Sequence, residues 1–381
     1  MAGSLWQKHR NASRLVPAAG SHWPTLSILL LSLGLNGTLP DRAQAHREVF
    51  TPAEKEQLKA AERIHLETLA LTDRGAADTG DISAIVTSRL EALGYRLLSD
   101  PAQPHDVTVK VKCEERKVWE GTVTSGGDAD QVDAASRLWK GPACQITYRI
   151  NNHNSDWRHE VRGEATKSTP EAMPADKLKT SARTMAQLTE RLAGDPFPFL
   201  LAGAWNQPSR LLKALDDPAT TQTQKTTIIS LLGNMFAVEA IPGLSRMLKE
   251  KDPALVQSAA VALGAIGHED CIPVLLEELK DNRPEVRLAA IKGLGRLAPL
   301  HPNSEIVPVL LAQLPRESVP TQTEIVRALG KTTDRRILEP LRALNRSVQE
   351  KTRSDSTPEL KELKRALGQS LDQFDGVHTE E

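Results

Sequence analysis

The sequence lacks an excess of charge of either sign. Its 48 lysines and arginines stand against 49 aspartates and glutamates, which gives a formal net charge of −1. A protein that binds nucleic acid in general carries a marked basic excess, because it has to neutralise phosphates. We therefore expect no nucleic-acid partner.

Cysteine is scarce as well, with three in 381 residues. Cys113 ends the alternating run VTVKVKC and Cys144 begins CQITYRI, each in phase with the apolar residues of its run. Both thiols should lie on the buried face of a strand, as a cross-strand disulfide or as two free cysteines. Export would favour the disulfide, because disulfides persist outside the cytosol. Cys271 is left over and is expected to be buried and inert.

The start of the chain lacks an apolar run long enough to span a bilayer. TLSILLLSLGL (25–35) is too short, follows a basic stretch (8–14) and precedes Ala43-Gln44-Ala45, which fits the small-x-small cleavage rule. We expect a signal peptide over residues 1–45, cleaved after Ala45, and a periplasmic or secreted product without stable membrane insertion. The alternative is an uncleaved membrane anchor. No Cys follows the run, so no lipoprotein anchor is expected.

Composition then changes along the chain. Alternating valines and most tryptophans lie before about residue 165, whereas the part after about residue 200 is rich in Leu, Ala, Glu, Lys and Arg. This change indicates a strand-bearing domain followed by a helical one. The expected organisation is a small α+β domain (46–165), a linker and capping helix (166–206), a helical region (207–346), and a C-terminal capping helix and tail (347–381).

The pattern of the first domain predicts the element order β-α-β-β-β-β. Alternating residues indicate strands, and a helix is expected to be capped by Asp81 and to end at Gly94. One sheet packed against at least one helix gives an α+β architecture. The expected strands are 63–72, 95–99, 105–116, 143–150 and 156–165.

Two polar groups in this domain are weak candidates for chemistry. His153, Asp156 and His159 are close in sequence, but no ligand stands at a recognised metal spacing, so a solvated hairpin tip is the expected structure. GGDAD (126–130) lacks the twelve-residue pattern of a calcium loop and is interpreted as a mobile loop.

The helical region repeats itself. One motif recurs as LGNM (232–235), LGAI (263–266), LGRL (294–297) and LGKT (329–332). A second recurs in step as IPGLSRML (241–248), IPVLLEEL (272–279), VPVLLAQL (307–314) and ILEPLRAL (337–344). Periods of this length indicate a stack of helix pairs, each burying its apolar face on the next.

The segment DPALVQSAAVALGAIGHEDCIPVLLEELKDNRPEVRLAAIKGLGRL (252–297) resembles the HEAT repeat family in its short, PBS-lyase-like form. The resemblance extends over about residues 207–346 and implies an all-α solenoid of helix pairs with an inner, concave surface. The motifs of tetratricopeptide and ankyrin repeats, which have similar periods, do not occur.

The leucine of each LGxx motif sets the register of the inner helices. Residues three and four positions before it are the expected core: Ile228, Ile229, Ala259, Ala260, Ala290, Ile291, Ile325 and Val326. Positions two before and two after it should face solvent on the concave side: Ser230, Asn234, Val261, Ala265, Lys292, Arg296, Arg327 and Lys331. We predict that the last four, all basic, bind an acidic surface of an unknown protein. Ordinary solvated charges are the alternative.

Some HEAT proteins are enzymes, and the chain resembles deoxyhypusine hydroxylases in repeat type. Those bind iron through His-Glu pairs on the inner helices, but Gln257, Ser258, Arg287 and Leu288 stand at the corresponding positions here. No metal or cofactor is therefore expected, and nothing marks a bilin pocket. GKTT (330–333) lacks the first glycine of a phosphate-binding loop.

Four reactive residue types, His268, Glu269, Asp270 and Cys271, stand side by side in the second repeat. The repeat register places them between two helices, so we interpret this stretch as a joint and not as a reactive site.

Helices are also predicted at both ends of the repeats. One carries Met185, Leu188 and Leu192 on one side, and another starts at Thr357-Pro358 with leucines at helical spacing. Such helices shield the terminal cores of a solenoid.

The sequence thus predicts an exported, non-catalytic scaffold that binds a partner protein through the concave face of a HEAT-like solenoid. The competing hypothesis is an enzyme or metal-binding protein with a site at the domain junction.

Overall fold

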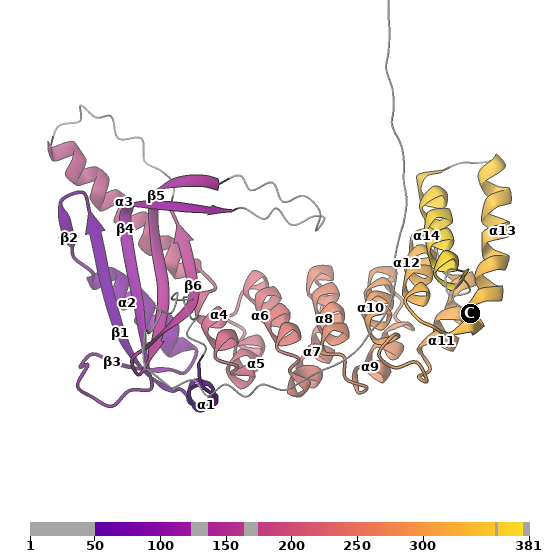
Figure 1. Cartoon of the computed structure of the whole chain (residues 1–381), viewed down its shortest axis with the longest axis horizontal. Helices are drawn as coiled ribbons and strands as arrows, with labels where there is room; N and C mark the ends of the chain where they lie inside the picture. The colour runs from indigo at the N-terminus through magenta and orange to yellow at the C-terminus, as the bar shows by residue number, and fades with distance from the viewer. Residues whose placement is uncertain (1–49, 123–135, 164–173, 355–356, 376–381) are drawn as a thin grey trace, which may run out of the picture. The chain divides into compact units, whose positions relative to one another are not determined.

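The computed structural model describes residues 50–122, 136–163, 174–354 and 357–375 (Figure 1). The predicted signal peptide and the GGDAD segment lie outside these residues. No helix within the described ranges combines the length and the apolar character needed to cross a membrane. A sheet module is followed by a row of helix pairs, so the predicted fold class, an α+β domain before a HEAT-like solenoid, is confirmed.

The sheet module contains one sheet and three helices among the described residues. Its elements are α1 (Pro52–Lys59), β1 (Arg63–Thr72), β2 (Gly75–Ala77), α2 (Gly80–Ala92), β3 (Arg96–Leu98), β4 (Val107–Thr122), β5 (Ser136–Ile150), β6 (His153–Arg162) and α3 (Pro174–Gly194).

The predicted element order missed α1 and β2. Both are short: α1 starts at a capping box made by Thr51 and Glu54, and β2 is a three-residue strand that pairs with β1. The helix predicted to start after Asp81 is α2, which starts at Gly80. The last strand begins at His153 and not at 156, because the hairpin turn consists of two asparagines only.

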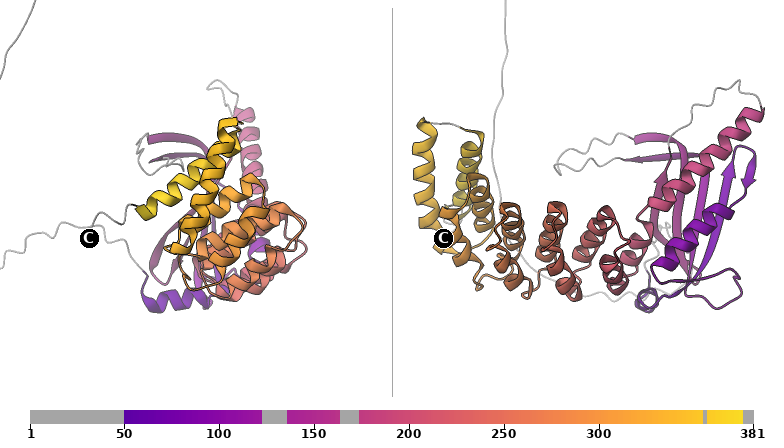
Figure 2. Two further views of the ribbon diagram at one scale, coloured as in Figure 1. Left: turned by 90° about the vertical axis from the view of Figure 1, so that its right-hand side faces the viewer. Right: turned by 180° about the vertical axis from the view of Figure 1, so that it is seen from behind.

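The strands follow the order β2-β1-β4-β5-β6, with β3 paired to β1. β4 runs parallel to β1 and antiparallel to β5. Helices α2 and α3 lie side by side on one face of the sheet (Figure 2). The helix predicted within the 166–206 linker is α3, and it covers this sheet, with Leu188 and Leu192 fully buried.

Alternation along β4 separates a buried face from a charged one. Val109, Val111 and Cys113 are fully buried, whereas Lys110 is exposed and Lys112 is half-buried. The register places Cys113 directly opposite Cys144, with 3.9 Å between their Cα atoms, and a disulfide bond joins them. The disulfide predicted from the sequence is therefore present in the structure.

The helical part contains two sets of helices that alternate along the chain. In order they are α4 (Phe197–Ala204), α5 (Pro208–Asp216), α6 (Gln222–Asn234), α7 (Ile241–Met247), α8 (Pro253–Ile266), α9 (Cys271–Glu278), α10 (Pro284–Leu297), α11 (Ile306–Gln313), α12 (Val319–Gly330), α13 (Leu338–Ser354) and α14 (Pro358–Asp375).

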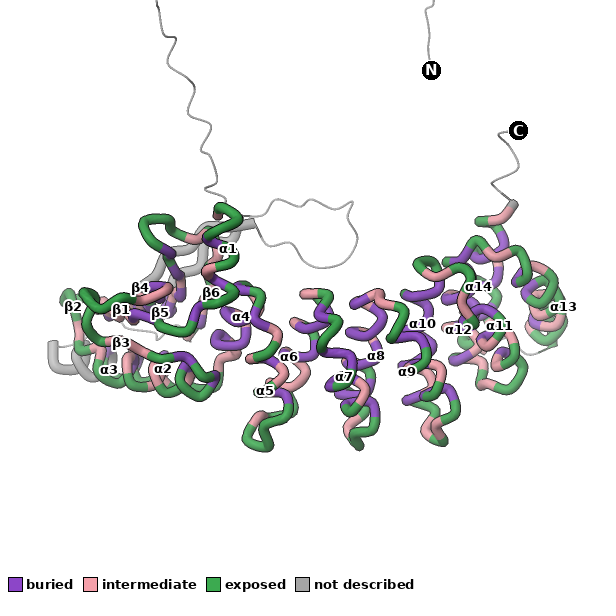
Figure 3. Tube along the Cα trace, turned by 90° about the horizontal axis from the view of Figure 1, so that it is seen from below, coloured by how far each residue is buried: buried purple, intermediate pink, exposed green. Residues whose placement is uncertain are grey.

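Helices α4, α6, α8, α10, α12 and α14 pack one on the next, and we call them the first-helix row (Figure 1). Each helix between them, such as α7 or α9, packs against the member of the row that follows it. All eight core residues predicted from the LGxx register are buried. Figure 3 shows buried stretches along α6, α8 and α10. In the described residues the row ends with α14, which packs on α12 and whose Leu363 and Leu367 are fully buried.

Small residues bring the helices of the row into very close contact. A Cβ atom added to one glycine of each helix would lie within 3.1 Å of an atom of the next helix, which is closer than real Cβ contacts normally come. We call these contacts the glycine steps; they are Gly203 to Leu231, Gly233 to Ala262, Gly264 to Gly293, Gly295 to Ala328, and Gly330 to Ser370. Four of the five glycines are those of the LGxx motifs.

The turn between α4 and α5 joins the solenoid to the sheet module. Gln207 lies in this turn and is only 4% exposed. Its Nε2 donates hydrogen bonds to the carbonyl oxygens of Leu58 (2.8 Å), Ala61 (3.0 Å) and Lys59 (3.2 Å), at the end of α1. Its Oε1 accepts a hydrogen bond of 2.6 Å from the hydroxyl group of Tyr95. One side chain thus satisfies polar groups of both α1 and the segment after α2.

Aromatic packing continues this junction. The ring of Trp205 meets Tyr95 and Tyr148 edge to face, at centroid distances of 5.4 and 5.5 Å. The guanidinium group of Arg210 lies 4.1 Å from the centroid of the Tyr95 ring and donates to the carbonyl of Leu93. Burial raises the pKa of Tyr95, so its hydroxyl group stays protonated. The buried residues of the sheet module and of the helices form one hydrophobic cluster.

Reduction of the disulfide should destabilise the protein. The bond closes a loop of 31 residues, for which the loss of chain entropy in the unfolded state corresponds to about 4 kcal/mol. Urea unfolding with and without dithiothreitol measures the difference. The double variant Cys113→Ala/Cys144→Ala is the control, because its unfolding curve should not respond to the reductant. Identical curves for the native sequence under both conditions would refute a structural disulfide.

Gly264→Ala should destabilise the protein by roughly 1–3 kcal/mol, because the added methyl group would overlap the backbone of Gly293 and push α8 from α10. Gly368→Ala on α14 is the matched control, since nothing lies within 4 Å of its added Cβ. There the gain in helix propensity should stabilise by up to about 1 kcal/mol. Thermal and urea unfolding measure the change in stability of each variant. An equal change for the two substitutions would show that the glycine steps do not control the packing.

Candidate functional site

The four basic residues predicted from the repeat register lie together in the structure. A hollow of about 180 Å³ opens between α10 and α12, with Val261 of α8 at one side. It is lined by Lys292 and Arg296 of α10, by Arg327 of α12, by Lys331, which follows α12, and by one carboxylate, that of Glu324. The sequence therefore located a cluster of cations on two neighbouring helices.

The local sequence explains this convergence. Lys292 and Arg296 are four residues apart, as are Arg327 and Lys331, so each pair occupies one stripe of its helix. Between the stripes a Cβ on Gly295 would lie 2.8 Å from the Cβ of Ala328. The glycine step therefore holds the two helices close enough for their cations to line a common hollow.

The four cations differ in their partners. Arg327 donates a 2.6 Å hydrogen bond to Glu324 and also contacts the carboxylate of Glu362 on α14. Lys292, Arg296 and Lys331 form no ion pair with any residue in the described part of the chain. Three positive charges around the hollow thus remain uncompensated there, and together they can attract an anionic group.

The same helix positions are uncharged earlier in the row. Ser230 and Asn234 of α6 are exposed, and Val261 and Ala265 of α8 are half-buried. The surface of the first-helix row therefore changes from neutral at α6 and α8 to basic at α10 and α12, which is the gradient that the register predicts.

The histidine group of the sheet module is not brought together. His153 contacts Glu54 of the α1 capping box, while Nε2 of His159 lies 2.8 Å from Oδ1 of Asp195, at the start of the helical part. His153 is more than a solvated hairpin tip, because it ties the β5–β6 hairpin to α1. Both histidines link elements of the fold.

The stretch from His268 to Cys271 is a joint, as predicted. Nδ1 of His268 accepts a hydrogen bond of 3.3 Å from the backbone N–H of Asp270, and α9 begins at Cys271. Cys271 is fully buried, and burial raises the pKa of its thiol to about 11. A thiol with this pKa is protonated at neutral pH and is a poor nucleophile.

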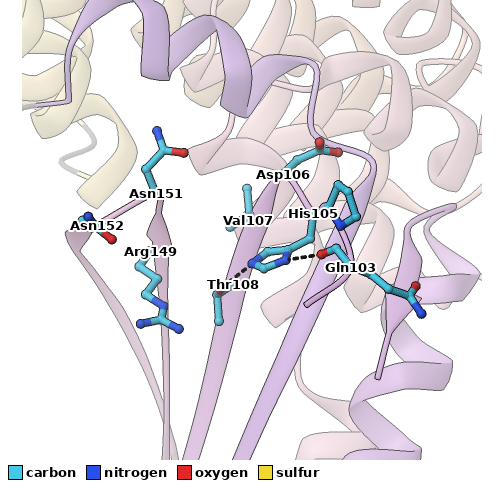
Figure 4. Close-up of a pocket in the computed structure, with 9 residues that line it drawn as sticks. Gln103, His105, Asp106, Val107, Thr108, Arg149, Asn151 and Asn152 are labelled. Atoms are coloured by element: carbon cyan, nitrogen blue, oxygen red, sulfur yellow. Dashed lines mark hydrogen bonds between the residues drawn. The ribbon is translucent and has the colours of Figure 1, made fainter. Parts of the chain in front are cut away.

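Sequence reasoning missed a polar hollow of about 380 Å³ at the end of the sheet (Figure 4). His105 lies at its centre and uses both ring nitrogens, with Gln103 O and Thr108 Oγ1 each at 3.0 Å. Arg149, across the strands from Thr108, donates to Glu67. The residues that line the hollow come from two segments, 103–108 and 149–152, which only the strand register brings together, so no motif could reveal it. No base is paired with a nucleophile here, and hydrogen bonding is the chemistry that it offers.

A metal site has no evident ligand set in the described residues. No group of three or more His, Cys, Asp or Glu side chains there is arranged to hold an ion. At the positions where the hydroxylase resemblance would place iron ligands, Arg287 donates from Nε to Glu317 at 2.8 Å, and the other three residues are Gln257, Ser258 and Leu288. An arginine engaged in this way and a leucine cannot ligate a metal, so these residues do not fit a His-Glu iron centre.

Comparison with known proteins identifies the helical part. A model of HEAT repeats matches residues 272–361, and a model of the PBS lyase HEAT-like repeat matches residues 256–281. Among characterised proteins, a deoxyhypusine hydroxylase of Candida albicans is 36% identical over 86 residues, which are 22% of this chain. The match spans about a quarter of that relative, 26% of its length.

Among solved structures, a designed armadillo repeat protein in complex with the peptide (KR)4 is 15% identical, with a TM-score of 0.34. The match covers 53% of this chain and 95% of the armadillo protein. An engineered protein from a structural genomics consortium is 19% identical, with a TM-score of 0.31. The match covers 54% of this chain and 93% of the engineered protein. The two motifs that recur in step, the buried LGxx register and the matches over residues 256–361 agree: this part of the chain consists of HEAT repeats.

Proposed function

We propose that this chain is an exported, non-catalytic scaffold that binds an acidic surface of a partner protein on its first-helix row. The observation that carries the proposal is the hollow between α10 and α12. Lys292, Arg296 and Lys331 line it and have no ion-pair partner among the described residues. Unpaired cations on neighbouring helices are suited to charge-assisted hydrogen bonds with carboxylates.

The fold supports binding by a preformed surface. The glycine steps fix the distance between α10 and α12, so the cations need little rearrangement when a ligand arrives. An uncharged residue of α8, Val261, borders the hollow, which lets an uncharged part of the partner lie beside its acidic part. The mechanism is recognition alone, with no covalent step.

Export is supported by two features of the chain. Residues 1–45 have the basic start, the apolar run and the cleavage pattern of a signal peptide. The disulfide between Cys113 and Cys144 would persist in an oxidising compartment such as the periplasm or the extracellular space.

A second candidate function is that of a metal-dependent enzyme, which the similarity to a deoxyhypusine hydroxylase favours. Gln257, Ser258, Arg287 and Leu288, which stand at the motif positions of that family's iron ligands, do not fit an iron centre, so we favour the scaffold.

Reversal of the three unpaired charges should abolish binding of an acidic peptide. For Lys292→Glu/Arg296→Glu/Lys331→Glu we expect an affinity for an oligoglutamate peptide at least about tenfold weaker, by isothermal titration calorimetry. Added salt should weaken binding to the native sequence, because exposed charges are screened. The control Lys213→Glu/Arg346→Glu/Lys351→Glu changes the net charge equally on α5 and α13. Equal loss in both variants would remove the hollow as the binding site.

Elemental analysis distinguishes the scaffold from the enzyme. Protein expressed with iron in the medium and dialysed without chelator should contain far less than one iron, zinc or manganese ion per chain. A chelator-treated sample serves as the blank. Stoichiometric metal that survives dialysis would contradict the scaffold proposal and favour the enzyme.

A further inference from the structure

Arg327 is the one cation of the hollow that already has carboxylate partners in the described structure. One is Glu324, a turn earlier on α12; the other is Glu362, which α14 contributes from 35 residues away. Glu362 also accepts a 2.7 Å hydrogen bond from Arg365. The hydrogen bond from Arg365 and the charges of both arginines lower the pKa of Glu362, so it is ionised at neutral pH.

The position of Glu362 is set by the last glycine step. Gly330 of α12 meets Ser370 of α14, and the hydroxyl group of Ser370 donates a 3.2 Å hydrogen bond to the carbonyl of Val326. Leu363, the neighbour of Glu362, is fully buried. The helix that caps the solenoid therefore presents a fixed carboxylate at the end of the basic surface.

We infer that Glu362 is an internal occupant of this surface: together with Glu324 it neutralises Arg327, so that a partner's acidic residue cannot pair with this cation. The inference rests on the proposed function. An acidic segment can pair with Lys292, Arg296 and Lys331, but at Arg327 it meets the negative charges of Glu324 and Glu362 and is repelled. On the opposite side it meets Val261 and Ala265, which offer no charge.

This arrangement defines the class of partner. The site fits a short acidic segment of a protein, bounded on the α8 side by uncharged residues. It disfavours a long acidic tract, because the far end of such a tract would have to displace Glu362 from Arg327. Glu362 thereby determines specificity by repulsion, and the basic residues supply the attraction.

Substitution of Glu362 by Gln in the full chain tests the inference. The amide keeps the size of the side chain and removes its charge. We expect Glu362→Gln to bind an oligoglutamate peptide about threefold more tightly, the effect of one exposed charge pair, and with a steeper dependence on salt. Glu359→Gln is the matched control: it makes the same charge change on α14, and Glu359 is exposed. Its affinity should equal that of the native sequence, and circular dichroism verifies that both variants are folded.

The outcomes separate the inference from the proposed function. If the native sequence binds the peptide and Glu362→Gln binds it no more tightly than Glu359→Gln does, Glu362 does not occupy the site and the inference is overturned. If neither the native sequence nor Glu362→Gln binds the peptide, the proposed function itself is wrong. Tighter binding by Glu362→Gln that is lost again on Lys292→Glu/Arg296→Glu/Lys331→Glu supports both.

Discussion

The close approach of successive helices at the glycine steps is the constraint on which the structure depends. In each LGxx motif the leucine is buried, and the glycine after it leaves room for the backbone or a small side chain of the next helix. Side chains at this position would hold the helices apart and open the core between them. The glycine step between Gly295 and Ala328 also brings the basic residues of α10 close to those of α12. The basic hollow therefore results from the same close contacts between helices that form the solenoid.

The sheet module and α14 protect the two ends of this stack. A solenoid exposes apolar surface wherever its repeats stop. At the first end α4 packs on α5 and α6, and Trp205 and Gln207 at its end enter the sheet module. At the other end α14 packs on α12 through Ser370. Both caps also have a second role. The sheet module joins a disulfide-bonded sheet to the first-helix row, and α14 brings Glu362 into contact with Arg327 of the basic hollow.

Sequence reasoning was sufficient wherever a regular period linked residues to one face. The repeats, the buried positions around each LGxx motif and the four cations follow from helical spacing alone. Two alternating runs in phase predict that Cys113 and Cys144 are buried, but they do not distinguish a disulfide from two free thiols. It failed where single contacts join distant segments. Nothing in the repeat register links Glu362 to Arg327 or Gln207 to the end of α1, and β2 is too short to show a period.

The central claim is that a partner's acidic segment binds between α10 and α12. Hydrogen–deuterium exchange of the full chain, with and without saturating oligoglutamate peptide, tests it most directly because it locates the contact without altering the protein. The account predicts slower exchange in peptides covering residues 284–297 and 319–331 and unchanged exchange in the sheet module. Protection confined to the sheet module, or to α5 and α7, would contradict it.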